Sequence, residues 1–197
     1  MKKMLVSAAL AATALVPSAA VAQSLPAAVV AVVDVERVTS QCNACKTAMA
    51  ALRSQQTALE NQAKSLRTPL ETEQKSLQTA IDALPQGKEP DAALQARAKA
   101  FQTKYQQAQQ TVARQEQQIA RNQQYVQKQV SDKLSPIFQQ VMQRRGANIL
   151  VEQGATLATS TSVDVTNDVL TALNTALPSI ATVAPAPAQP KQQPQGR

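Results

Sequence analysis

Two apolar ladders with heptad spacing run through the middle of this chain, on either side of one short segment that breaks helices. In the first, leucines recur every seven residues in two series, Leu52, Leu59 and Leu66, then Leu70, Leu77 and Leu84. The second ladder holds two sevenfold series offset by four residues, one of which is Tyr105, Val112, Ile119 and Val126. This spacing is typical of a coiled-coil seam, because it keeps apolar side chains on one face of a helix.

The breaking segment reads Pro-Gln-Gly-Lys-Glu-Pro-Asp over residues 85–91. Folding the chain about Gly87 brings Leu70 near Tyr105, and the other apolar positions of the two ladders also find partners. Two helices that merely followed each other would have no reason to match in mirror register. We therefore expect a long antiparallel helical hairpin over residues 41–145, with its tip at the breaking segment.

The composition disfavours catalytic chemistry. The 197 residues include no His, no Trp, four Gly and only 2% aromatic residues, which is little material for an enzyme pocket. No nucleophile paired with a base, no pair of carboxylates at a site and no phosphate-binding Gly-rich loop can be named. We expect a protein that is not an enzyme, uses no ATP and carries no cofactor.

Residues 1–22 predict a cleavable export signal. Two lysines precede an apolar stretch over residues 5–17, and Ala-Val-Ala at residues 20–22 offers a small-x-small cleavage site. The alternative is a membrane anchor, which the stretch is too short to form across ~30 Å of hydrocarbon. No later apolar run is long enough to span a membrane, so we expect a soluble mature protein in a periplasm.

Segments with strand character adjoin both ends of the expected hairpin. Residues 27–35 form an uninterrupted β-branched run that suits a strand buried on both faces. After the second helix, residues 148–154 and 155–159 are two shorter candidates separated by a Gly turn signal. These segments predict a small β-rich body made of residues 23–40 and 146–178.

A short helix is expected at the end of this body. Thr166 is a plausible N-cap, Asp168 falls in the first turn, and Pro178 ends the helix. One helical face carries Val169, Leu170, Leu173 and Leu177. The Pro/Gln-rich residues 179–197 bury too little apolar surface to offset their chain entropy, so we expect a disordered tail.

The size of this body implies an oligomer. A small sheet and one short helix bury too little to support two helices of roughly 60 to 80 Å, at 1.5 Å per residue. The first strand, with apolar groups on both faces, also needs neighbours beyond its own chain. Several copies that share one β-rich hub satisfy both needs, and the argument admits a dimer as well as a trimer.

Three segments carry a resemblance to a known family. The C-terminal signature of the Skp/OmpH family of periplasmic chaperones resembles Gly-Ala-Asn-Ile-Leu-Val at residues 146–151 and Thr-Ser-Val-Asp-Val-Thr-Asn-Asp-Val-Leu-Thr-Ala-Leu-Asn at residues 161–174. The family's first strand and its turn into a helix resemble Val-Val-Asp-Val-Glu-Arg-Val at residues 32–38. The resemblance extends over residues 28–177, which leaves out the tail.

The resemblance implies a homotrimer, mostly α with a small β body, whose long antiparallel coiled-coil hairpins are arms around a cavity. The implied function is an ATP-independent holdase that keeps unfolded outer-membrane β-barrel proteins from aggregating. Arms rich in Ala, Val, Leu and Gln suit this role, since they offer many weak contacts and no deep pocket. The alternative is a structural coiled-coil spacer of the cell envelope, which would need no cavity.

Two prolines within the expected arm are candidate hinges. Pro69 lies midway along the first helix, and Pro136 lies at the level of the arm's root. Proline removes a backbone donor and clashes with the preceding turn, so it bends a helix. Each could equally be a tolerated kink with no function.

A basic cluster is expected near the arm tip, made of Lys88, Arg97, Lys99 and Lys104. One interpretation is a solvated helix face. The other is electrostatic capture of acidic clients or of an anionic membrane surface. The family resemblance implies lipopolysaccharide as a partner, although the family's basic cluster has no residue-by-residue match here. Nucleic acid is disfavoured as a partner, because export removes it and aromatic stacking residues are nearly absent.

Cys42 and Cys45 have several possible roles. A thioredoxin-type exchange site lacks its βαβ context, and a metal site lacks enough ligands within one chain without His. In an oxidising compartment we favour a disulfide, either within the chain or between subunits, that tightens the root of the arm.

Overall fold

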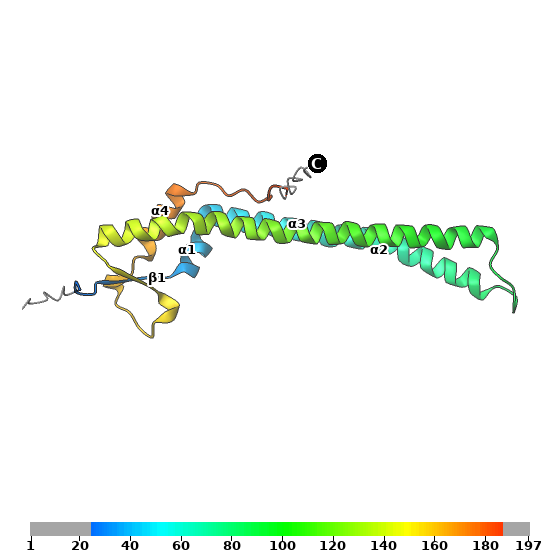
Figure 1. The fold of residues 1–197 in the computed structure, drawn as a ribbon, viewed down its shortest axis with the longest axis horizontal. Coiled ribbons are helices and arrows are strands. Elements are labelled where there is room, and N and C mark those ends of the chain that lie inside the picture. Colours follow the sequence, from blue (N-terminus) through cyan, green and yellow to red (C-terminus); the bar gives the residue numbers. More distant parts are fainter. Residues whose placement is uncertain (1–24, 187–197) are drawn as a thin grey trace, which may run out of the picture.

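The computed structural model describes residues 25–186 and is mostly helical, as the sequence predicts, with one two-stranded sheet in place of the three expected strands (Figure 1). The expected export signal and residues 187–197 of the expected tail lie outside the described residues. The elements follow in the order β1 (Val30–Val33), α1 (Val35–Gln41), α2 (Asn43–Asp82), α3 (Ala92–Arg145), β2 (Ile149–Glu152), the 3₁₀ turns η1 (Gln153–Ala155) and η2 (Thr161–Val163), and α4 (Thr166–Ala176).

The long helices α2 and α3 lie side by side and run in opposite directions (Figure 1). Their direction follows from two contacts between side chains, because Gln55 meets Asn122 near the body and Glu73 meets Arg97 further out. Local sequence sets the start of α3. The Asp91 carboxylate accepts a hydrogen bond from the Leu94 amide at 2.8 Å.

The seam between α2 and α3 is buried on both helices near the body, whereas toward the tip only α2 contributes a buried side chain. In α2 it buries Leu52, Leu59 and Leu77, and in α3 it buries Ile119, Asn122, Val126 and Val130. No side chain of α3 before Ile119 is buried. Tyr105, a predicted seam residue, is 47% exposed.

Strands β1 and β2 pair in parallel, with Val30 opposite Ile149 and Val33 opposite Glu152. Parallel neighbours need a long crossover, and here α1, α2 and α3 together form it. Strand β1 is shorter than the predicted run, since residues 25–29 are not in a strand. Its residues Ala31 to Val33 are buried in the body.

The second predicted strand after the arm, residues 155–159, is wrong. The chain leaves the sheet through η1, and Leu157 is fully exposed, with no neighbour against which a strand could pack. A different segment meets the other side of β1. The Val165 amide donates to the Val32 carbonyl at 2.8 Å, and Asp164 forms a parallel bridge with Val32.

Helix α4 completes the body by packing on α1 and α3. Its apolar face matches the prediction, because Val169, Leu173 and Leu177 are buried in the main core. The predicted N-cap is wrong. Thr166 is the first residue of the helix, and the Asp164 carboxylate accepts the Thr166 amide at 2.8 Å in its place.

Residues 179–186 also differ from the expected disorder. They continue from α4 as an extended segment alongside the long helices (Figure 1). Ile180 packs against the cluster of Ala48, Leu52 and Val126 that lies between α2 and α3. One apolar side chain and several main-chain hydrogen bonds therefore hold a segment whose composition alone predicts disorder.

Candidate functional site

A root groove opens between α2 and α3 where the two helices leave the body. Its volume is about 1130 Å³, and α1 closes one end of it. The lining is largely apolar and includes Met49, Leu52, Val126, Val130, Leu134 and Phe138. Met49 is 49% exposed, so a large apolar side chain faces solvent here. The groove can therefore bind apolar segments of another chain by burying their side chains against this apolar lining.

A smaller middle groove of about 490 Å³ follows further along the same two helices. The Phe101 and Tyr105 rings lie in it with centroids 6.1 Å apart. Leu66, Leu70, Ala108 and Val112 complete its apolar surface. Leu70 and Tyr105, which the mirror register places together, line the same groove. The charged side chains of Arg67, Glu71 and Glu116 border it.

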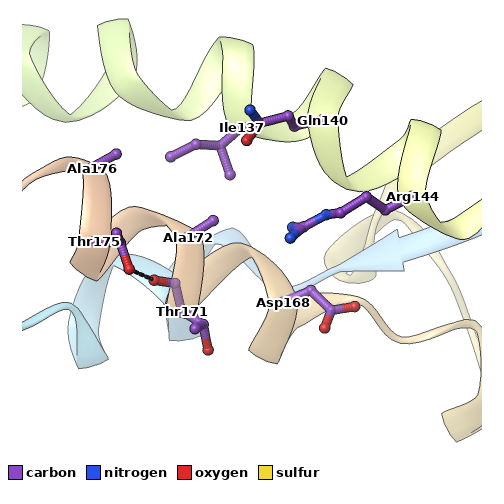
Figure 2. A pocket seen from close by; sticks show the side chains of 8 residues that line it. All are labelled: Ile137, Gln140, Arg144, Asp168, Thr171, Ala172, Thr175 and Ala176. Atoms are coloured by element: carbon purple, nitrogen blue, oxygen red, sulfur yellow. Dashed lines mark hydrogen bonds between the residues drawn. The ribbon is translucent and has the colours of Figure 1, made fainter.

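A third pocket, of about 380 Å³, lies between α3 and α4 (Figure 2). Figure 2 shows Arg144 and Asp168 at one end and Ile137 with Ala176 at the other. The Asp168 carboxylate is held by Arg145 in an ion pair at 2.6 Å. Asp168 is the only carboxylate that lines this pocket, and it is engaged in this ion pair. The lining offers no nucleophile with a base beside it.

The four residues of the predicted basic cluster do not share one environment. The Arg97 guanidinium forms an ion pair with Glu73 at 3.0 Å and donates to the Ser76 hydroxyl at 3.0 Å. It therefore ties α3 to α2. The lysines Lys88, Lys99 and Lys104 are exposed and make no ion pair within residues 25–186. These three remain the candidate contacts for an anionic partner.

Both candidate hinge prolines lie inside continuous helices. Pro69 is exposed within α2, and Pro136 is exposed within α3. The residue after Pro136, Ile137, is buried in the main core. Leu134, two residues before Pro136, is buried in the same core, so Pro136 lies within the part of α3 that packs on the body.

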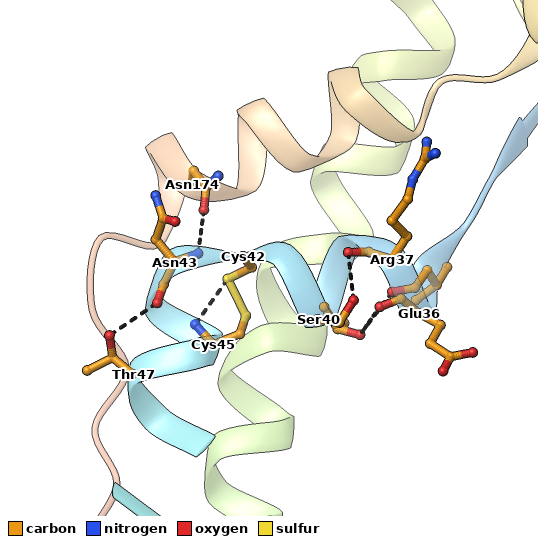
Figure 3. The surroundings of a disulfide bond; sticks show 10 residues. Glu36, Arg37, Ser40, Cys42, Asn43, Cys45, Thr47 and Asn174 are labelled. Atoms are coloured by element: carbon orange, nitrogen blue, oxygen red, sulfur yellow. Dashed lines mark hydrogen bonds between the residues drawn. A yellow bond between two sulfur atoms is a disulfide. The ribbon is translucent and has the colours of Figure 1, made fainter. Parts of the chain in front are cut away.

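Cys42 and Cys45 form a disulfide at the junction of α1 and α2 (Figure 3). Both are buried in the main core, and their Cα atoms are 5.1 Å apart. Cys42 also caps α2, since its sulfur accepts the Cys45 amide at 3.2 Å. The Asn43 amide beside it donates to the Asn174 side chain at 2.9 Å, which links the junction to α4. The pair is placed to hold the root of the arm to the body.

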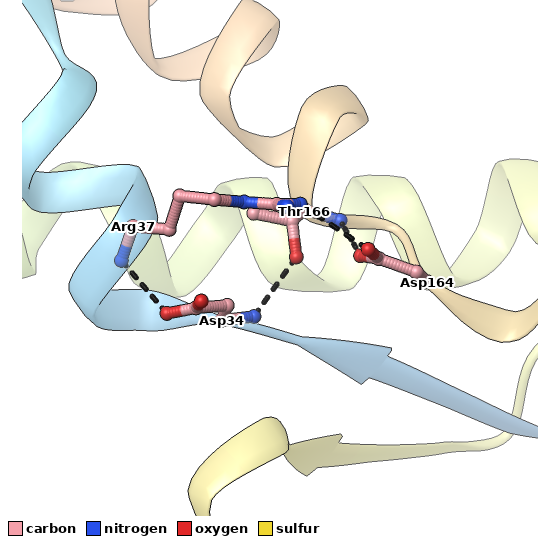
Figure 4. Close-up of polar contacts among 4 residues, drawn as sticks. All are labelled: Asp34, Arg37, Asp164 and Thr166. Carbon is pink, nitrogen blue, oxygen red and sulfur yellow. Dashed lines mark hydrogen bonds and ion pairs between the residues drawn. The ribbon is translucent and has the colours of Figure 1, made fainter. Parts of the chain in front are cut away.

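A polar network joins β1, α1 and α4 (Figure 4). The Asp34 carboxylate accepts the Arg37 amide at 2.7 Å, and the Arg37 guanidinium pairs with Asp164 at 3.2 Å. Burial raises the pKa of Asp164, but hydrogen bonds from Thr166 and the charge of Arg37 outweigh it and leave that pKa below its ordinary value. No local pattern predicts this network, because Asp34 and Arg37 are far in the chain from Asp164 and Thr166.

Among residues 25–186, no group of three or more His, Cys, Asp or Glu side chains gathers as a metal site. None of the helices in this part of the chain is long and apolar enough to cross a membrane.

The fold and these grooves define a protein with a small α/β body and a long two-helix projection that carries shallow apolar surfaces. Comparison with known proteins identifies its family. The family model described as outer membrane protein (OmpH-like) matches residues 29–173. The chain therefore belongs to the OmpH-like family, in agreement with the resemblance found in the sequence.

A solved structure shares the fold. It is the crystal structure of a proposed outer membrane chaperone (OmpH-like) from Caulobacter crescentus CB15, with a TM-score of 0.68 and 20% sequence identity. The match covers 84% of this chain and 96% of that one. No curated protein sequence matches the chain significantly.

Proposed function

We propose that this protein is an ATP-independent periplasmic holdase that binds unfolded outer-membrane β-barrel proteins and prevents their aggregation. The observation that carries the proposal is the pair of open apolar grooves spaced along α2 and α3. Membership of the OmpH-like family and the fold shared with a proposed outer membrane chaperone support it.

The chemistry of such clients suits these grooves. Strands of a barrel protein alternate apolar and polar side chains, and in water they aggregate through exposed apolar faces and unpaired main-chain groups. Two shallow grooves can cover several such segments without requiring a particular side chain. Because each contact is weak, the client can leave without ATP.

The body supports the proposal of a homotrimer. Val30 and Ile149, a pair in the sheet, are each more than 40% exposed, and Leu157 is fully exposed. Within the described residues β2 pairs only with β1, so its outer edge is open to another chain. Copies that share these surfaces would project their two-helix arms from one hub and enclose a client between them. The number three comes from the family resemblance.

Two further parts of the proposal concern location and charge. The predicted export signal at residues 1–22 supports a periplasmic location for the mature protein, where clients pass on their way to the outer membrane. The exposed Lys88, Lys99 and Lys104 provide positive charge for acidic clients, an anionic membrane surface or lipopolysaccharide. This charge acts over about 8 to 10 Å at physiological salt.

The decisive experiment dilutes a denatured outer-membrane barrel protein into buffer containing this protein, and follows aggregation by light scattering. We expect suppression at one trimer per client. The double variant Met49→Asp with Tyr105→Asp places charges in the two grooves and should lose most of the suppression. Its control, Ala50→Asp with Gln106→Asp, adds the same charges at exposed neighbours outside both grooves and should keep it.

The second candidate function is a structural spacer of the envelope. The lengths of α2 and α3, 40 and 54 residues, favour it, because such helices can bridge a distance without binding anything. A spacer would not suppress aggregation. If the wild-type protein leaves the light scattering of the diluted client unchanged, the spacer function therefore replaces the holdase proposal.

A further inference from the structure

Four amide side chains form a row beside the seam of α2 and α3. They are Gln55 of α2 and Gln118, Asn122 and Gln129 of α3, and we call this row the amide ladder. Asn122 is its centre and is only 3% exposed. Its nitrogen donates to the Gln55 oxygen at 2.7 Å, and its oxygen accepts from Gln118 at 2.8 Å. Gln55, Asn122 and Gln118 therefore form a connected polar network built into the arm, and Gln129 donates separately to the Tyr125 carbonyl at 3.1 Å.

The amide ladder binds the main chain of residues 178–186. The Gln129 side chain makes a two-point contact with Ala181, donating to its carbonyl at 2.8 Å and accepting its amide at 3.0 Å. The Asn122 oxygen accepts the Ala184 amide at 2.8 Å, and Gln55 donates to the Thr182 carbonyl at 3.1 Å. A primary amide offers both a donor and an acceptor, so it can pair with the main chain of any residue except at proline nitrogens.

The bound segment alternates in the manner of a strand. Ile180, Thr182 and Ala184 are partly buried against the arm, whereas Ala181 and Val183 face solvent, Val183 with 65% of its surface exposed. Ile180 is its single large apolar anchor, set against Ala48, Leu52 and Val126. This site thus holds an extended chain by its main chain and by side chains at every second position.

We propose that the amide ladder is a main-chain binding site for extended polypeptide, occupied in the free protein by residues 178–186, which strands of unfolded barrel clients displace. This inference rests on the proposed function and specifies how clients are recognised. Barrel strands have the same period of two and carry unpaired amides and carbonyls. Residues 178–186 satisfy the ladder in the absence of client, and their tether gives them a high effective concentration, which a client overcomes by binding through several segments at once.

Binding experiments on the full-length chain test the competition. The probe is a fluorescent peptide of about 10 alternating apolar and polar residues, the length of a barrel strand. Ile180→Asp removes the apolar anchor and should tighten peptide binding about fivefold, because the site is then free in a larger fraction of molecules. The matched control Val183→Asp adds the same charge on the solvent side and should bind like wild type.

Two further measurements identify the main chain as the recognised group. Adding Gln129→Leu to Ile180→Asp should weaken peptide binding, and so should methylation of alternate amides in the peptide. Hydrogen exchange reads the displacement directly. The Ala181 and Ala184 amides should be protected in the free protein and lose that protection when the peptide is added.

Some outcomes would overturn the inference. They are peptide binding by Ile180→Asp that is no tighter than by wild type, equal binding of the methylated peptide, or amide protection that persists at saturating peptide. If wild type still suppresses aggregation in those cases, the holdase proposal stands and only the role of the ladder fails. If wild type does not suppress aggregation, the proposed function fails first.

Discussion

The Thr166 hydroxyl accepts a hydrogen bond from the Asp34 main-chain amide at 2.9 Å, across 132 residues of chain. Thr166 is fully buried at the start of α4, and Asp34 caps α1 immediately after β1. This one contact joins the two parts of the body on either side of the long two-helix insertion. Thr166 is the first residue of α4, so its hydroxyl serves this contact and not the cap of its own helix.

Loss of this hydroxyl should destabilise the body. Thr166→Val keeps the side-chain shape but leaves the Asp34 amide without an acceptor, so we expect the free energy of unfolding to fall by about 1 to 3 kcal/mol. Urea unfolding followed by circular dichroism measures it. The control Thr171→Val, at an exposed position of α4, should change the value by less than about 0.5 kcal/mol. Equal stability of the two variants would remove Thr166 from this role.

Acid should weaken the body through Asp164. Its folded pKa lies below the ordinary value of 3.8, so the carboxylate stabilises the fold above the unfolded pKa. That contribution is lost as the pH falls through the lower folded pKa. Asp164→Asn retains an oxygen for the Thr166 amide but cannot titrate. Between about pH 5 and pH 3, the melting temperature of wild type should fall more steeply than that of the variant. Parallel curves would contradict the assignment.

Reduction should loosen the root of the arm. For so short a loop, loss of the disulfide between Cys42 and Cys45 should lower the free energy of unfolding by about 2 kcal/mol. Reductant should therefore lower the urea midpoint of wild type and leave that of the Cys42→Ala, Cys45→Ala double variant unchanged. On denaturing gels the unreduced protein should migrate as a single chain. A dimer band that reductant removes would show that the cysteines link subunits.

Pro69 should control the spread of the arms. Its replacement by Ala restores an amide that can donate to the Ser65 carbonyl and removes the clash with the preceding turn. The helix should gain up to about 3 kcal/mol, and the arm should stiffen. Small-angle scattering should then show a smaller change in maximum dimension on client binding than in wild type. The neighbouring variant Thr68→Ala serves as control. If all three proteins respond alike, Pro69 is not a hinge.

Charge at the tip should speed client capture. Lys88→Gln with Lys99→Gln should slow association with an acidic client about threefold at low salt, and the difference should vanish near 1 M salt, where screening acts within about 3 Å. Stopped-flow fluorescence measures the rate. The control Lys46→Gln with Lys133→Gln removes the same charge near the root. A rate that depends only on net charge would fall equally in both variants and would rule out the tip.

Local sequence was sufficient for the long helices and for α4. Heptad spacing leaves each long helix one apolar face, which only a facing helix can cover, and the segment around Gly87 leaves few residues for the turn between them. Helix α4 was predictable for the same reason, since Val169, Leu173 and Leu177 follow helical spacing. Periodicity could not identify the family, because heptads alone fit many coiled coils. The family signature made that identification possible.

The misplaced elements depend on partners far along the chain. Residues 155–159 have the composition of a strand, but the place beside β1 is taken by Asp164 and Val165. Thr166 has the chemistry of a cap, yet its hydroxyl serves Asp34. No local pattern encodes either pairing.

The sequence by itself thus determined the two long helices and α4, where the long helices turn and which family the chain joins, because these depend on patterns within single segments. Only the tertiary structure decided which polar groups bond to one another. It set the polar network of the body, the placing of Arg97 against Glu73, and the capture of residues 178–186 by the amide ladder. Hydrogen bonds require two atoms within about 3 Å of each other, and that proximity exists only after the chain has folded.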